Sequence, residues 1–233
     1  MVRVSPEIWR VSNGLVEFEC SPVGLLQLRD AQGVDQLSAP LRPCRYRDRG
    51  EFWDAWDIAA DYRRHPLELE PVGSVQLLES GPLVAQLVVT YRVGASRMRL
   101  DLRLKADCPW LELIVSVDWC QRHELLRLDI PLASTAVRLA ADTSGGVIER
   151  PAHPQTPREQ ERWEVPAISW LASQAKAPGG GIAVLLDGPQ GVDGATDRLG
   201  VSLLRGATWP DPSADQGQQL SLIHISEPTR PLY

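Results

Sequence analysis

Two tryptophans and two aspartates share one short stretch of the chain, Trp53-Asp54-Ala55-Trp56-Asp57. In an extended strand, successive side chains point to opposite faces, so each face would carry one indole and one carboxylate. A buried carboxylate is costly unless it is hydrogen-bonded, and an indole needs a partner for its N–H. The stretch is therefore either a structural corner or the wall of a polar cleft suited to sugars, which offer apolar C–H faces and hydroxyl groups. The residues themselves favour the structural corner.

Arg150 lies in a second stretch that could bind a ligand, at the point where an expected strand leads into a long polar loop. A guanidinium at a loop mouth can bind a carboxylate or sugar hydroxyls through several donors. Spacing alone favours a simpler alternative, an ion pair with Glu149 or Glu161 at the rim. The nearby His153 has an ordinary pKa near neutrality, which suits an acid or base. No serine or cysteine nucleophile accompanies it, which favours a solvated loop histidine.

The residue types that bind metals are scattered along the chain. A catalytic zinc needs about three converging protein ligands, and neither the histidines nor the cysteines show such spacing. The absence of a C-x-x-C pair favours buried free thiols over a disulfide framework, and we expect no metal or other cofactor in this chain. The residues concerned are Cys20, Cys44, Cys108, Cys120, His65, His123, His153 and His224.

Length and composition limit the class of protein. The 233 residues suffice for one large β domain or two smaller ones, and 43% hydrophobic with 23% charged residues is typical of a soluble globular protein. A net charge of −6 favours neither nucleic acid nor an anionic membrane. No window approaches the roughly 20 apolar residues of a membrane span, and the first residues lack the apolar core of a secretory signal. We therefore expect a cytoplasmic protein.

The clearest predicted strand spans residues 97–105, where every even position is apolar and every odd position is charged. This period of two predicts one face toward the core and one toward water. The core face would carry Met98, Leu100, Leu102 and Leu104. Other strands are expected at 11–18 (broken by Asn13-Gly14), 24–28, 68–78, 83–93, 111–119, 125–132, 147–151, 167–171, 181–186 and 199–204; residues 140–146 and 187–193 indicate a loop and a turn, and 152–162 a surface excursion.

Many short strands with Gly and Pro between them, and no evident amphipathic helix longer than two turns, predict an all-β protein built as a large antiparallel β-sandwich. Residues 1–219 would form this sandwich. Residues 220–233 begin apolar and then lose any pattern, and they resemble the translation of a sequencing-adapter read-through. We exclude them from function; the alternative is a genuine last strand at 220–225 followed by a disordered end.

Several segments resemble glycoside hydrolase family 38, the α-mannosidases, in the same order along the chain. The most specific is Ser202-Leu203-Leu204-Arg205, followed by a Pro-Asp and by Ala214-Asp215-Gln216-Gly217. The resemblance covers roughly residues 11–217 and implies the C-terminal β-sandwich region of that family, which is similar to galactose mutarotase. The other matching segments are residues 51–67, which include the tryptophan stretch, 146–153 (Gly-Val-Ile-Glu-Arg-Pro-Ala-His), 162–166 and 181–187.

The resemblance also implies a catalytic domain that this chain lacks, because no segment matches the zinc ligands or the aspartate nucleophile of the family. The chain is then expected to be a C-terminal fragment of an enzyme that hydrolyses terminal α-mannosides with retention, using zinc or another divalent metal. It would pack on that catalytic domain and would be inactive alone. Arg150 is carried over as a candidate sugar contact, with Trp53, Asp54 and Asp57 as weaker ones. After His153, residues 154–158 depart from the more aromatic run of the family.

Two other functions stay open on the residues alone. One is a free-standing carbohydrate-binding sandwich, with Trp53, Trp56 and Trp209 as stacking platforms for sugar rings. The other is a mutarotase-like sugar epimerase, with His153 and a glutamate as acid and base.

Overall fold

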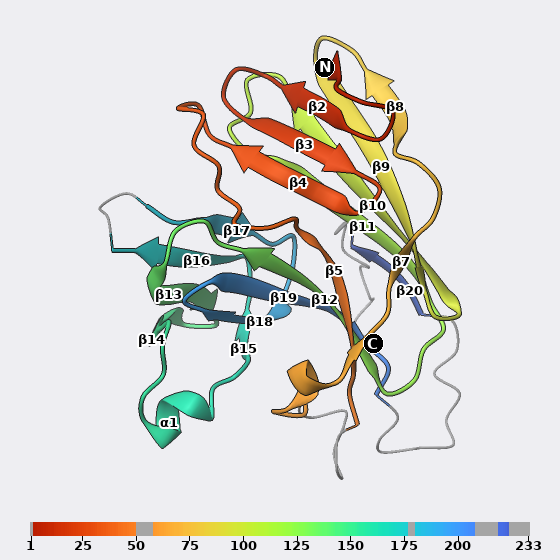
Figure 1. Cartoon of the computed structure of the whole chain (residues 1–233). Coiled ribbons are helices and arrows are strands. Elements are labelled where there is room, and N and C mark those ends of the chain that lie inside the picture. Colours follow the sequence, from red (N-terminus) through yellow and green to blue (C-terminus); the bar gives the residue numbers. More distant parts are fainter. Residues whose placement is uncertain (1, 50–57, 177–179, 208–218, 224–233) are drawn as a thin grey trace, which may run out of the picture.

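The structure is a computed structural model that describes residues 2–49, 58–176, 180–207 and 219–223, the last range as backbone only. Within these ranges the regular secondary structure consists of β-strands joined by turns and loops, apart from the 3-10 turn η1 (Tyr62–Arg64) and the short helix α1 (Pro157–Gln160) (Figure 1). The named strands pair antiparallel throughout. The predicted all-β antiparallel fold class is confirmed. No helix among these residues is long and apolar enough to cross a bilayer.

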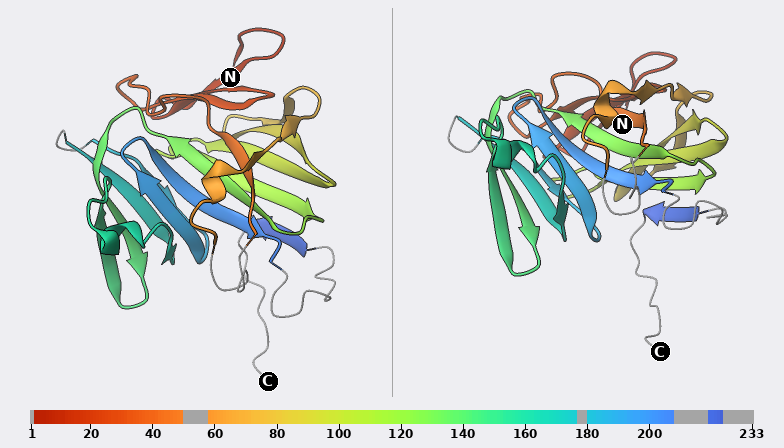
Figure 2. Two further views of the ribbon diagram at one scale, coloured as in Figure 1. Left: turned by 60° about the horizontal axis from the view of Figure 1, so that its bottom comes forward. Right: turned by 90° about the horizontal axis from the view of Figure 1, so that it is seen from below.

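The N-terminal meander covers one face of a larger sheet (Figure 2). Phe18 and Leu25 of the meander share one hydrophobic core with Leu100 and Leu102 of the larger sheet. The meander has the order β1 (Val2–Arg3), β2 (Trp9–Ser12), β3 (Glu17–Ser21), β4 (Gly24–Arg29); the larger sheet has the order β20 (Gln219–Ile223), β11 (Glu112–Trp119), β10 (Ser96–Lys105), β9 (Val84–Val93), β7 (Glu70–Pro71), with β8 (Gln76–Ser80) also on β9.

Two further sheets complete the described fold, and they carry the polar side chains discussed below. In the first, three segments far apart in sequence lie side by side, because β12 pairs with β5 on one edge and with β19 on the other. Its order is β15 (Val165–Ala167), β18 (Gln190–Ala195), β19 (Arg198–Arg205), β12 (Glu124–Pro131), β5 (Arg42–Arg47), β6 (Pro66–Leu67); the second has the order β14 (Gly146–Pro151), β13 (Ala136–Thr143), β16 (Trp170–Ala175), β17 (Ala183–Leu185).

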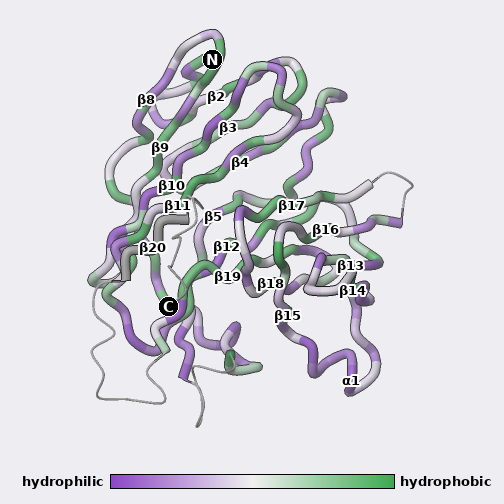
Figure 3. The backbone as a smooth tube through the Cα atoms, turned by 180° about the vertical axis from the view of Figure 1, so that it is seen from behind, coloured by the Kyte–Doolittle hydropathy of each residue, from purple (hydrophilic) through white to green (hydrophobic). Residues whose placement is uncertain are grey.

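The alternating strand at 97–105 lies in β10, and its apolar face is core as predicted. Met98, Leu100, Leu102 and Leu104 are at most 2% exposed. The opposite face is not simply open to water, since Asp101 is buried and accepts a hydrogen bond from Gln86 Nε2 at 2.6 Å. Figure 3 shows hydrophobic and hydrophilic residues alternating along many of the strands, whereas α1 is hydrophilic.

The expected strand at 11–18 is instead a hairpin of β2 and β3. Asn13 Oδ1 accepts hydrogen bonds from the backbone N–H groups of Leu15 and Val16, both at 2.9 Å, so the asparagine side chain closes the turn. Gly14 has a φ of +86°, which a glycine adopts without steric cost. The pair Asn13-Gly14 therefore makes the turn and does not interrupt a strand.

Other expected boundaries also differ. The loop expected at 140–146 lies largely within β13, and the turn expected at 187–193 overlaps β18. The expected strand at 68–78 is divided between β7 and β8. The polar excursion after Ala152 contains α1, whose first turn is fixed by a capping box between Thr156 and Glu159. Each difference arises from local hydrogen bonds or strand pairing, which the spacing of apolar residues in the sequence does not reveal.

Candidate functional site

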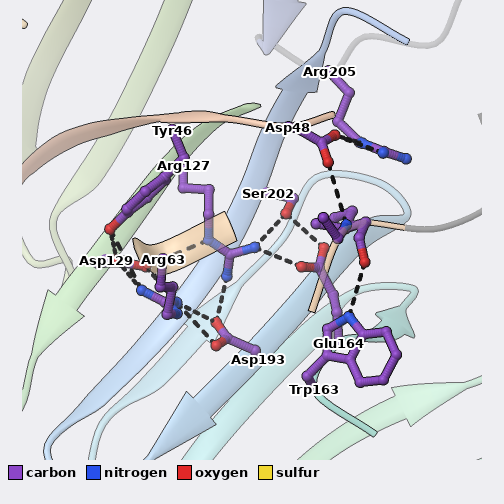
Figure 4. A network of polar contacts seen from close by, with 12 residues as sticks. Tyr46, Asp48, Arg63, Arg127, Asp129, Trp163, Glu164, Asp193, Ser202 and Arg205 are labelled. Atoms are coloured by element: carbon purple, nitrogen blue, oxygen red, sulfur yellow. Dashed lines mark hydrogen bonds and ion pairs between the residues drawn. The ribbon is translucent and has the colours of Figure 1, made fainter. Parts of the chain in front are cut away.

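Arg127 has no exposed side-chain surface, although it carries a full positive charge in the middle of β12. Its Nη1 donates to Glu164 Oε2 at 2.6 Å and to the Ser202 hydroxyl, and its Nη2 donates to Asp193 Oδ1 (Figure 4). A buried charge is tolerated only when it is paired and hydrogen-bonded. Glu164 precedes β15, Asp193 lies in β18 and Ser202 lies in β19, so these partners tie Arg127 to three other segments of the same sheet region.

Two more arginines extend this arrangement. Arg63 of η1 donates to Asp129 at 2.7 Å and to Asp193 at 2.9 Å, and Arg198 of β19 pairs with Asp193 at 3.1 Å. We call the three guanidinium groups and their three carboxylates the arginine network. Its members are Arg63, Arg127, Arg198, Asp129, Glu164 and Asp193. The formal charges balance, which indicates a structural assembly rather than a reactive site.

Two tyrosines cover the network. The Tyr62 ring centroid lies 5.1 Å from the Arg63 guanidinium carbon and 5.3 Å from that of Arg127, within range of cation–π attraction. The Tyr46 ring meets Tyr62 edge to face at 5.1 Å, and the Tyr46 hydroxyl donates to Asp129 at 3.0 Å. Burial raises the pKa of both phenols, so they stay neutral and act only as hydrogen-bonding and packing groups.

The ionisation of Asp129 depends on this setting. Burial alone would raise the pKa of the carboxyl group, but hydrogen bonds from Arg63 and the charges of Arg127 and Arg198 outweigh burial and lower the pKa. Asp129 is therefore ionised at neutral pH. Burial disfavours the charged form of Arg63, and its carboxylate partners overcome that effect and raise its pKa.

Gly200 leaves room for the network. A Cβ built at this position would overlap Asp193 Oδ1 and Arg127 Nη2, and would lie 2.9 Å from Asp129 Oδ1. No other residue type fits without displacing a buried ion pair. The glycine is required here by close approach and not by an unusual backbone angle.

A pocket of about 530 Å³ opens beside the network. Arg150 of β14 lines it and donates from Nη1 to the backbone carbonyl of Arg162 at 2.7 Å. Neither of the rim ion pairs considered for Arg150 forms, and Glu149 binds Arg138 at 2.6 Å instead. Burial lowers the pKa of Arg150. We call this cavity the Arg150 pocket; its other charged lining residues are Arg63, Glu149, Arg158, Glu159, Arg162, Asp193 and Arg198.

The weaker candidates Trp53, Asp54 and Asp57 lie outside the described residues, as do Trp56 and Trp209. The first residue described after them, Ile58, accepts a hydrogen bond at 3.1 Å from the indole N–H of Trp163, which lines the Arg150 pocket.

His153 is exposed and does not line the pocket.

Among the described residues, no group of three or more His, Cys, Asp or Glu side chains could hold a metal ion. The zinc that the family resemblance implies was expected in the catalytic domain and not among these residues. All four cysteines are free; Cys20 and Cys108 are buried, but Cys120 is exposed, contrary to the prediction of buried thiols throughout. Burial raises the pKa of Cys20 to about 12, so that thiol stays protonated.

The arginine network was not anticipated from the sequence. Its only local signal is the presence of Arg127 and Asp129 at alternate positions of an otherwise apolar strand, Leu125-Leu126-Arg127-Leu128-Asp129-Ile130. Period two places the two charged residues on one face together with Leu125, but it does not show that a further layer covers that face. Here Ile58 and Tyr62 pack on Leu125 and cover it.

Residues 11–213 match the family model of the glycosyl hydrolases family 38 C-terminal domain. The chain belongs to this family. Its similarity to human alpha-mannosidase 2C1 is 25% identity over 217 residues, which is 89% of this chain and 20% of the human protein. Its similarity to alpha-mannosidase G of Dictyostelium discoideum is 29% identity over 171 residues, 71% of this chain and 16% of that protein.

The fold agrees with this assignment. A family 38 glycosyl hydrolase structure from Enterococcus faecalis superposes with a TM-score of 0.68 at 11% identity, covering 91% of this chain and 28% of that one. An α-mannosidase structure from Enterococcus faecalis V583 gives a TM-score of 0.66 at 11% identity. This family 38 chain spans about a fifth of the length of human alpha-mannosidase 2C1.

Gly200→Ala should destabilise the family 38 domain by about 1–3 kcal/mol or more, because the added methyl group displaces buried charges from their partners. Gly81→Ala is the matched control, since the nearest atom to a Cβ there is 3.7 Å away. Urea unfolding followed by tryptophan fluorescence gives both free energies of unfolding. Equal losses in the two variants would show that the space around Gly200 is not limiting.

The lowered pKa of Asp129 predicts a pH-dependent loss of stability. A carboxylate whose pKa is lower in the folded state adds stability that is present above its unfolded pKa, about 3.9, and is lost as the pH falls through the folded value. Asp129→Asn should therefore be less stable than the native chain above about pH 5, and the difference should shrink as the pH drops below about 4. Urea midpoints of both proteins across this range measure it; a constant difference contradicts the assignment.

Proposed function

We propose that this chain is the C-terminal β domain of a retaining, metal-dependent enzyme that hydrolyses terminal α-mannosides. The observation that carries the proposal is the family match over residues 11–213, together with relatives named α-mannosidases that align with up to 89% of the chain. On this proposal the chain packs on the catalytic domain, which supplies zinc or another divalent metal and the nucleophile. Four free cysteines support action in the cytoplasm, where thiols remain reduced.

We further propose that the Arg150 pocket contributes to carbohydrate binding. Arg150 donates one hydrogen bond to the backbone carbonyl of Arg162, and a guanidinium has further N–H donors that suit sugar hydroxyls. Trp163 adds an indole to the lining of the pocket. The hydrogen bond from Trp163 to the carbonyl of Ile58 also connects the pocket to the residue that follows Asp57. Trp53, Asp54 and Asp57 remain candidate sugar contacts.

The domain assignment is tested by activity with and without the catalytic part. The purified chain should release no nitrophenol from nitrophenyl α-mannoside in the presence of zinc or cobalt. The same chain expressed with the coding sequence that precedes it in its source genome should release nitrophenol. Turnover by the purified chain alone, or a preceding sequence without a glycosidase domain, contradicts the proposal.

In that longer enzyme, Arg150→Ala should lower kcat/KM by roughly ten- to a hundredfold, because each charge-assisted hydrogen bond is worth about 1.5–3 kcal/mol. The melting temperature should change little, since the described contact of Arg150 is a single hydrogen bond to a backbone carbonyl. Arg97→Ala is the control: Arg97 is exposed on β10 and lies outside the pocket. A fall in melting temperature with unchanged kcat/KM would place Arg150 in the scaffold.

A further inference from the structure

Arg150 is a partly buried guanidinium without an ion-pair partner among the described residues. Its side chain donates one hydrogen bond, to the carbonyl of Arg162. Its other N–H groups have no hydrogen-bond acceptor among the described residues. Burial is the largest cause of its lowered pKa and the charge of Arg162 adds to it, whereas the charges of Asp193 and Glu164 offset this lowering only in part. A group in this setting is stabilised by any anion that reaches it.

Three neighbouring arginines share the pocket with spare donors. Arg158 and Arg162 line it, are exposed and form no ion pair within the described chain. Arg198 also lines it, and its Nη1 is buried without a hydrogen-bond partner. Buried donors that lack a partner are uncommon and costly, so a ligand or ordered solvent that accepts from Arg198 would be favourable.

The acidic residues of the pocket are already committed. Asp193 accepts from Arg63, Arg127 and Arg198. Glu149 pairs with Arg138, which is outside the pocket lining.

The third acid, Glu159, accepts from the backbone N–H groups of Gln155 and Thr156 at 2.9 and 3.0 Å, within the capping box of α1. The lining therefore contains five arginines, Arg63, Arg150, Arg158, Arg162 and Arg198, against three occupied carboxylates, Glu149, Glu159 and Asp193.

We propose that the Arg150 pocket is an oxyanion site, in which Arg150, Arg162 and Arg198 bind a carboxylate or phosphate group of a small molecule. Planar guanidinium forks match the oxygen spacing of both groups. A volume of about 530 Å³ admits a sugar-sized molecule and not only a free ion. This inference extends the proposed carbohydrate-binding role of Arg150. The binding of an anion follows from the charges of the pocket, and only the expectation that the anion is carried by a sugar rests on the proposed function.

The test is isothermal titration of the purified full chain at constant ionic strength with orthophosphate and, separately, with succinate. We expect saturable binding of at least one of them, and the arm that binds more tightly identifies the preferred group. Arg150→Gln should weaken that binding by roughly ten- to a hundredfold. Arg97→Gln removes the same charge from the far sheet and should leave the binding unchanged.

A second pair of titrations separates this inference from the carbohydrate role. Mannose 6-phosphate should bind more tightly than mannose, and the difference should disappear in Arg150→Gln. Mannose binding that needs Arg150, without a preference for the phosphate, would overturn the anion site and leave the sugar contact standing. If phosphate binding needs Arg150 and mannose 6-phosphate binds no more tightly than orthophosphate, the anion site stands and the sugar contact is overturned.

Two further outcomes overturn the proposal. One is the absence of saturable binding of either anion, and the other is equal weakening by Arg97→Gln, which would indicate general surface charge. If Arg150→Gln fails to fold by circular dichroism, Arg162→Gln takes its place, because Arg162 is exposed and its substitution removes no core packing.

Discussion

The burial of one positive charge organises the described fold. Arg127 lies within β12, between β5 and β19, with no side-chain surface in contact with water. Removing one partner from such a group typically costs about 3–5 kcal/mol, because the remaining charge stays buried. The carboxylates of Glu164 and Asp193 must therefore be present, and their presence fixes how the segments that carry them approach β12. Gly200 is the steric counterpart of the same requirement.

Charge balance differs between the arginine network and the Arg150 pocket, which share Arg63, Asp193 and Arg198. Inside the arginine network, each guanidinium meets a carboxylate and the formal charges balance, although Nη1 of Arg198 is buried without a hydrogen-bond partner. In the adjoining pocket, Arg150 has no carboxylate partner in the described chain, although it is partly buried. In our proposal the network is structural, and the arginines of the pocket that lack a carboxylate partner bind the ligand. Asp193 joins the two, since it anchors Arg127 and also lines the pocket.

The family relationship shows how little sequence identity this architecture needs. At 11% identity the fold still superposes on the Enterococcus faecalis protein with a TM-score of 0.68. Burial on a sheet requires an apolar side chain at alternate positions, and many sequences satisfy that pattern. Close approaches such as the one at Gly200 are less permissive, because a single methyl group already collides with buried charges.

The sequence by itself determined the fold class, the family and the core face of β10, because Leu100 and Leu102 follow a period of two that has one physical interpretation. It also directed attention to Arg150, through the change from strand to polar loop. It did not determine the hairpin at Asn13, where a side-chain hydrogen bond sets the turn, nor the burial of Arg127. Alternation shows which residues share a face, whereas the layer that covers a face comes from distant segments. Only the tertiary structure placed Tyr62 of η1 over the charged face of β12 and brought Glu164 and Asp193 to Arg127, and so decided that this face is interior.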